Sequence, residues 1–188
     1  MANVDAPRGF TPVHHRPDKY RRYYKGTDAG IIGVGDPVVR QADSADPEGR
    51  PEIVRATTGS AITGVVVGIE PTRSDLSQLY LASADTGYVL VDDDPESLFY
   101  VQDNGGATGI VVANIGEHID SVAAIDADTT TGRSKYELDT EAIATDNTWR
   151  IERLVQRADN EVGANAEWVV SVNLHTDANA SATRKTEV

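Results

Sequence analysis

Hydrophobic residues gather in short runs rich in Val and Ile, and polar turn-forming stretches separate these runs. Runs of roughly four to eight such residues, bounded by Gly, Pro, Asn and Asp, are typical of β-strands. The strands predicted in this way cover residues 31–40, 61–70, 88–91, 98–102, 109–112, 149–155 and 167–174. In the last run Trp168, Val170 and Val172 share one face, which is the alternation expected of a strand with one buried face.

Polar connectors with turn-forming residues separate the predicted strands. The clearest cover residues 43–51, 103–108 and 126–133, the second with an Asn–Gly hairpin signal. Helical signals are weak and limited to residues 73–81, with Ser74 as the N-cap, and residues 139–144. Short strands at roughly ten-residue spacing favour a single all-β domain, a β-sandwich or barrel of the jelly-roll or β-tulip kind. We place this body at residues 27–175 and a polar C-terminal tail at residues 176–188.

Charge is distributed unevenly along the chain. Residues 1–25 carry six basic and two acidic side chains, a net +4, whereas the remaining 163 residues carry 11 basic and 28 acidic ones, a net −17. The whole chain of 188 residues therefore has a net charge of −13. Prolines at positions 7, 12 and 17 bias the first segment to extended geometry. We therefore predict an extended N-terminal arm, residues 1–26, that contacts an acidic partner, while the acidic body repels nucleic acid and anionic membranes.

Arginines and apolar side chains are interspersed within this arm, and both kinds of residue anchor interfaces. We expect its aromatic groups to enter apolar pockets of a partner and its arginines to face carboxylates there. The predicted partner-binding residues are Arg8, Phe10, Val13, Arg16, Tyr20, Arg21, Arg22, Tyr23 and Tyr24. The alternative for a basic N-terminus is a solvated, disordered tail.

The sequence contains no recognisable catalytic motif. It has no Cys, which excludes disulfides, a thiolate nucleophile and Cys–zinc sites, and it has neither a P-loop nor a G-x-S-x-G elbow. The four histidines, at positions 14, 15, 118 and 175, lack metal-ligand spacing. No apolar run approaches the roughly 18 residues of a membrane-spanning helix, and the N-terminus lacks the apolar core of a signal peptide. We therefore expect a soluble, non-enzymatic protein with no cofactor, no bound metal and no membrane contact.

Two acidic loops keep a second interpretation open. Asp92–Asp94 with Glu96 concentrates carboxylates, which hard cations prefer, but a solvated turn between two strands is the favoured interpretation of this loop. Residues 126–137 faintly resemble a calcium loop, but its glycine is displaced to Gly132. On this alternative the chain is a β-sandwich binding module for carbohydrate or calcium, such as a phage fibre or host-surface recognition domain.

Short motifs occur in a fixed order along nearly the whole chain. They are M-A-N-x-x-A-P-x-G-x-x-P-V at residues 1–13, G-D-x-V at 35–38, I-x-G-V-x-x-G at 62–68, D-D-P at 93–95, T-T-G-x-S-x-x-E-L at 130–138, L-V-x-R-x-D-N-x-x-G-x-N-A at 154–166 and N-x-H at 173–175. In this order they resemble the motifs of a family of small virion proteins of tailed bacteriophages, the head decoration or cement proteins. The chain departs from that pattern in the dense charge of residues 19–25 and in a longer tail after His175.

The resemblance implies a structural role rather than catalysis. A cement protein of this kind is made in the bacterial cytoplasm and sits on the outer surface of the capsid in the virion. There it clamps neighbouring capsid subunits against the pressure of packaged DNA. The implied partners are the major capsid protein and further copies of the same chain, a homotrimer in preference to a dimer. A basic, aromatic-rich arm on an acidic body suits this role.

Overall fold

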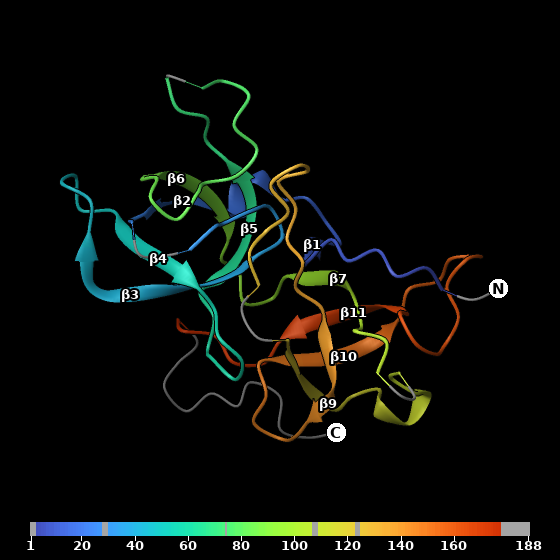
Figure 1. Ribbon diagram of the computed structural model, residues 1–188. Coiled ribbons are helices and arrows are strands. Elements are labelled where there is room, and N and C mark those ends of the chain that lie inside the picture. The colour runs from blue at the N-terminus through green and yellow to red at the C-terminus, as the bar shows by residue number, and fades with distance from the viewer. Residues whose placement is uncertain (1–2, 28–29, 74, 107–108, 123–124, 178–188) are drawn as a thin grey trace.

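Two β-sheets make up the described part of the protein, as the computed structural model shows (Figure 1). The structure describes residues 3–27, 30–73, 75–106, 109–122 and 125–177. Within these residues there are eleven strands and two 3₁₀ turns, η1 (Pro17–Lys19) and η2 (Val112–Asn114). The predicted all-β class is therefore confirmed. No helix in this described part has the length and apolarity needed to cross a bilayer.

The first sheet closes into a barrel with the strand order β2-β4-β3-β5-β6. Its strands are β2 (Tyr20–Lys25), β3 (Pro37–Ala45), β4 (Pro51–Arg55), β5 (Gly64–Ile69) and β6 (Gly87–Asp92). β2 pairs in antiparallel fashion with β6 and in parallel fashion with β4. Its interior is filled mainly by Val, Ile and Leu side chains, with Tyr23 from β2 among them.

The second sheet has six strands in the order β1-β7-β11-β10-β8-β9. They are β1 (Thr11–Pro12), β7 (Leu98–Gln102), β8 (His118–Ser121), β9 (Leu138–Ile143), β10 (Trp149–Leu154) and β11 (Glu167–Val172). Figure 1 shows this sheet beside the barrel, with β7, β10 and β11 running across it. Both tryptophans, Trp149 and Trp168, lie in its core with 0% exposure. Val169 is buried too, so β11 is covered on both faces rather than one.

The helical predictions are wrong where the structure tests them. Residues 139–143 fall in strand β9, because their pairing with β8 overrides a weak local propensity. Residues 75–81 form turns without a helix, and the predicted N-cap Ser74 lies outside the described residues. The run 109–112 is not a strand either. Residues 107–108 and 178–188, part of a predicted hairpin and of the predicted tail, also lie outside the described residues.

The predicted arm is not separate from the body. β1 pairs with β7, and β2 fills the position between β4 and β6 in the barrel. The backbone is extended in β1 and β2, but Pro17 begins the 3₁₀ turn η1, so the segment is not extended throughout. Its hydrogen bonds and apolar side chains are satisfied within the same chain. The boundary predicted between residues 1–26 and 27–175 therefore does not match the structure.

A buried lysine secures the end of β2. The ammonium group of Lys25, which has 0% exposure, donates to the carbonyl oxygens of Gly26 (2.9 Å), Ala82 (2.8 Å) and Asp85 (2.8 Å). A buried charge requires such polar partners, since isolated burial is costly. Lys25 thus ties the N-terminal segment to the loop that precedes β6.

Candidate functional site

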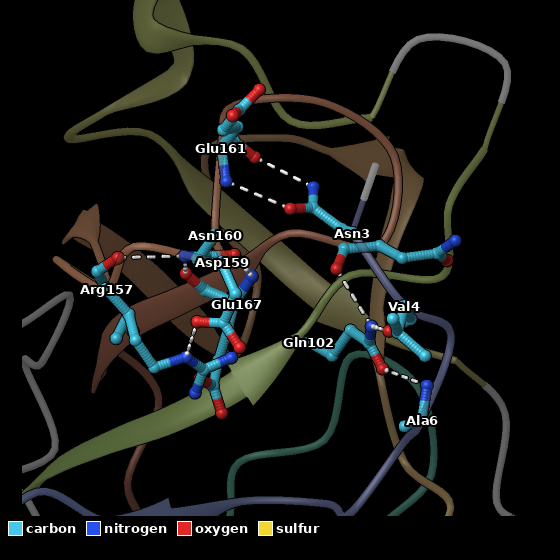
Figure 2. Close-up of polar contacts among 11 residues, drawn as sticks. Asn3, Val4, Ala6, Gln102, Arg157, Asp159, Asn160, Glu161 and Glu167 are labelled. Carbon is cyan, nitrogen blue, oxygen red and sulfur yellow. Dashed lines mark hydrogen bonds and ion pairs between the residues drawn. The ribbon is translucent and has the colours of Figure 1, made fainter. Parts of the chain in front are cut away.

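A cleft of about 590 Å³ lies between the N-terminal segment and the loop that joins β10 to β11. The side chains on β7 that point away from the core, Tyr100 and Gln102, contribute to its wall. Figure 2 shows the polar contacts that hold its two sides. The lining residues are Asn3, Val4, Ala6, Arg8, Gly9, Thr11, Tyr100, Gln102, Arg133, Val155, Arg157, Asp159, Asn160, Asn165 and Glu167.

Asn3 fastens the N-terminal segment to the β10–β11 loop. Its amide nitrogen donates to the carbonyl oxygens of Glu161 (2.8 Å) and Ala164 (3.0 Å). Its amide oxygen accepts from the backbone N–H of Glu161 at 2.9 Å, so one side chain makes a two-way clamp (Figure 2). The clamp joins residues that are 158 positions apart in the sequence.

Gln102 fastens the same segment to β7. Its amide nitrogen donates to the carbonyl of Val4 (2.7 Å) and of Asn165 (2.8 Å), and its amide oxygen accepts from the N–H of Ala6 (3.0 Å). Polar contacts thus hold residues 3–8 in place. The side chain of Val4 is not an apolar anchor, because the residue is 77% exposed. Apolar anchoring begins only at Phe10, which is 1% exposed.

Arg157 organises the opposite wall. It forms ion pairs with Asp159 at 2.5 Å and Glu167 at 2.6 Å. The hydrogen bond from Arg157 is the main reason that the pKa of the Asp159 carboxyl lies below its ordinary value, and the charge of Arg8 adds a smaller attraction. Asn160 spans the base of this loop, because its side chain donates to the carbonyl of Glu167 and accepts from the N–H of the same residue.

Buried carboxyl groups lie behind the cleft. Asp103 has 0% exposure and accepts from the N–H of Asn165 at 2.8 Å and the indole N–H of Trp168 at 3.0 Å. The neighbouring Glu137 has a buried carboxyl oxygen without a hydrogen-bond partner. Burial, and to a smaller extent the charges of Asp5 and Asp103, raises the pKa of Glu137 to about 7.

A second cavity of about 410 Å³ adjoins the first and shares Ala6, Arg8 and Arg133 with it. Its other lining residues are Pro7, Asp128, Thr131, Ser134 and Lys135. The two chain segments meet at Gly9, whose φ of +67° is one that glycine adopts without strain. A side chain at Gly9 would also overlap Ser134, so glycine is required for this close approach.

The motif segments at residues 1–13, 130–138 and 154–166 converge on these two cavities. These three segments are far apart in the sequence, and no local sequence pattern predicts that they lie together in the fold. Two signals could have pointed to the site: an Asn near the N-terminus and the D-N-x-x-G-x-N run after β10. Of the predicted binding residues, Arg8 lines the cleft directly, whereas the others lie elsewhere.

The prediction that Phe10 and Tyr23 enter pockets of a partner is wrong. Phe10 stacks on Trp149 with ring centroids 4.0 Å apart, inside the core of the second sheet. Tyr23 is 3% exposed in the barrel core, and its hydroxyl donates to Asp93 at 2.9 Å. Both side chains are satisfied by this chain because their strands bury them on forming the sheets.

Several other predicted binding residues remain at the surface with partners of their own. The guanidinium of Arg22 donates to both carboxylate oxygens of Glu70, at 2.7 and 2.6 Å, and lies 3.7 Å from the centre of the Tyr88 ring. Arg21 faces Asp93 at 3.3 Å with 71% of its side chain exposed. The remaining ones are the exposed Arg16 and the partly buried Val13, Tyr20 and Tyr24, of which Tyr24 packs against Tyr88.

The two acidic loops have the geometry of self-contained turns. Asp92 accepts from the hydroxyl of Ser97 at 2.9 Å, and Asp94 accepts from the N–H of Glu96 at 3.0 Å. Asp128 accepts from the N–H groups of Thr130 and Thr131, two and three residues further along the chain. Among the described residues no group of three or more His, Asp or Glu side chains is placed to hold a metal ion.

Comparison of the chain with protein-family models, with curated proteins and with solved structures finds no significant match. We take the cleft, with its clamped N-terminal segment and its arginines, as the candidate binding site. Its chemistry is that of recognition by hydrogen bonds and charge.

Proposed function

We propose that this protein is a capsid decoration protein that binds the outer surface of a tailed-bacteriophage head and stabilises the lattice of the major capsid protein. The observation that supports this most is the convergence of three motif segments of the resemblance, residues 1–13, 130–138 and 154–166, on one cleft. Motifs that come together in space in this way fit a shared structural and binding role.

The rest of the molecule is compatible with a clamp that carries out no chemistry. Two packed sheets with their own cores form a stiff body, and the N-terminal segment is integrated into both. Stiffness matters because a clamp that deforms cannot hold neighbouring subunits against pressure. The net charge of −13 discourages contact with the packaged DNA, which suits an external position.

Exposed basic groups provide contacts to acidic capsid surface. Arg8, Arg16 and Arg21 are all exposed, and exposed ion pairs contribute less than about 1 kcal/mol each. They therefore govern specificity and salt dependence more than total affinity. On the particle we expect homotrimers, since a trimer matches the local threefold positions of an icosahedral lattice.

Co-sedimentation tests this function. Purified full-length chain is mixed with heads that lack it, and bound protein is measured in the pellet against total protein. We expect saturable binding that weakens with salt and a rise in the temperature at which the heads release DNA. Pelleting no greater than that of an unrelated protein of the same net charge would refute the proposal.

A further inference from the structure

We infer that the joined cavities around Arg8 and Arg133 bind an extended acidic segment of a protein partner through its carboxylates. The preference of the site for carboxylates is argued from its geometry alone. The assignment of the acidic segment to a capsid subunit rests on the proposed function. The first cavity is about 590 Å³ and the second about 410 Å³, so together they offer room for several consecutive residues of an extended chain.

The positive charges of this site form no direct ion pair within it, although Arg8 attracts the carboxylate of Asp159 and Lys135 attracts that of Asp128 at longer range. Arg8, Arg133 and Lys135 line the cavities, are exposed, and form no ion pair with any residue in the described ranges. Most other arginines of the chain, such as Arg22 and Arg50, have a carboxylate partner on the surface. Although the net charge of the protein is −13, three basic side chains without an ion-pair partner therefore lie together around these cavities.

The acidic side chains that line the same cavities are already engaged. Asp159 and Glu167 both pair with Arg157. Asp128 accepts two backbone hydrogen bonds within its own turn, at 2.7 and 3.0 Å. These carboxylates are held by their own partners, so Arg8 and Arg133 remain available for an incoming anion.

Both arginines extend from rigid backbone. Arg8 precedes Gly9 and Phe10, whose N–H donates to the carbonyl of Gly35 at 3.0 Å and whose ring is buried. Arg133 precedes Ser134, whose N–H donates to the carbonyl of Val34 at 2.9 Å. Because Gly9 packs against Ser134, the two arginines start from adjacent points of the fold. Little backbone ordering is then needed on binding.

The side chains around the arginines suit a peptide. A guanidinium presents a planar fork of N–H donors that matches a carboxylate in two-point contact. Asn165 contributes an amide group to the same wall, and Tyr100 contributes an aromatic face. A long polyanion such as nucleic acid would instead be repelled by the surrounding acidic surface. A short acidic segment within a folded partner fits the few charges available.

Peptide binding to the full-length chain tests the inference. The probe is a fluorescently labelled hexaglutamate peptide, measured by anisotropy at about 50 mM salt, with hexaglutamine as the uncharged control. The test variant is R8Q/R133Q. The matched control is R73Q/R153Q, which removes the same charge from two exposed arginines that do not line the cavities. Thermal unfolding checks that both variants keep the wild-type fold, which we expect because all four arginines are exposed.

We expect hexaglutamate to bind the wild-type chain, with affinity at least ten-fold lower for R8Q/R133Q and within two-fold of wild type for R73Q/R153Q. Equal losses in both variants would show an effect of net charge only and would overturn the inference. Three other results would overturn the inference as well. They are equal binding of hexaglutamine, displacement of hexaglutamate by a neutral oligosaccharide, and complete displacement by inorganic phosphate at a concentration equal to that of the peptide's carboxylate groups.

Head binding by the same variants separates this inference from the proposed function. If R8Q/R133Q binds heads as tightly as wild type does, the acidic-segment site is wrong while capsid decoration stands. If the wild-type chain binds hexaglutamate through Arg8 and Arg133 but does not bind heads, the site stands and the proposed function fails.

Discussion

Replacement of Phe10 by Ala tests whether the N-terminal segment is part of the fold. The ring is 1% exposed and stacks on Trp149 at 4.0 Å, at an interplanar angle of 15°. Removing a buried Phe side chain from a core costs about 3–5 kcal/mol, and the lost aromatic pair accounts for roughly 0.5–1.5 kcal/mol of that loss. For a chain of this size, such a loss lowers the melting temperature by roughly 6–20 °C.

Urea unfolding followed by tryptophan fluorescence measures this loss, because Trp149 is in contact with the mutated position. The matched control is Val4→Ala in the same segment, where the side chain is 77% exposed and the change is expected to stay within about 0.5 kcal/mol. An arm that only docks on a partner makes the opposite prediction, namely that Phe10→Ala leaves the free protein as stable as wild type. A loss below about 1 kcal/mol would therefore refute the structural assignment of this segment.

Three further predictions follow from buried groups. Because the folded chain holds a proton on Glu137 up to about pH 7 and the unfolded chain releases it near pH 4.5, wild-type stability should fall across that range relative to Glu137→Gln. By pH 8, after discounting for solvent screening, urea titrations should show Glu137→Gln about 1–2 kcal/mol more stable than wild type. If the free energies of unfolding of the two proteins change in parallel with pH, this prediction is refuted. Gly9→Ala should cost roughly 1–3 kcal/mol in thermal unfolding, whereas the exposed Gly49→Ala, also at positive φ but with open space around it, should cost less. Lys25→Met should cost about 1–3 kcal/mol because it leaves buried carbonyl oxygens unpaired, and an unchanged unfolding midpoint would contradict that role.

The β class was predictable because it depends on local features. Runs such as residues 61–70 and 149–155 have β-branched composition and turn residues at their ends, and both contain strands. Residues 139–144 misled the prediction because propensity is a weak signal where pairing with a neighbour decides the structure. Closure of one sheet into a barrel depends on the pairing of β2 with β4 and β6, which no local pattern encodes.

The prediction for the N-terminal segment was correct about part of its backbone and wrong about where it binds. Proline spacing indicated an extended chain, and β1 and β2 are extended, but Pro17 begins the 3₁₀ turn η1 between them. Whether Phe10 and Tyr23 enter this chain's own core or another protein depends on contacts with Trp149 and with the barrel, which are remote in sequence. The cleft was missed for the same reason, since the Asn3 clamp links residues 158 positions apart.

On the proposed function a tailed phage encodes this chain, and electron cryomicroscopy of the heads of such a phage tests that central claim most directly. The account predicts density outside the shell that fits the barrel and the six-stranded sheet, repeated at symmetry-related positions and in contact with the major capsid protein. Heads whose outer surface carries no such density, while the chain is detected inside the particle, in the tail or not at all, would contradict capsid decoration.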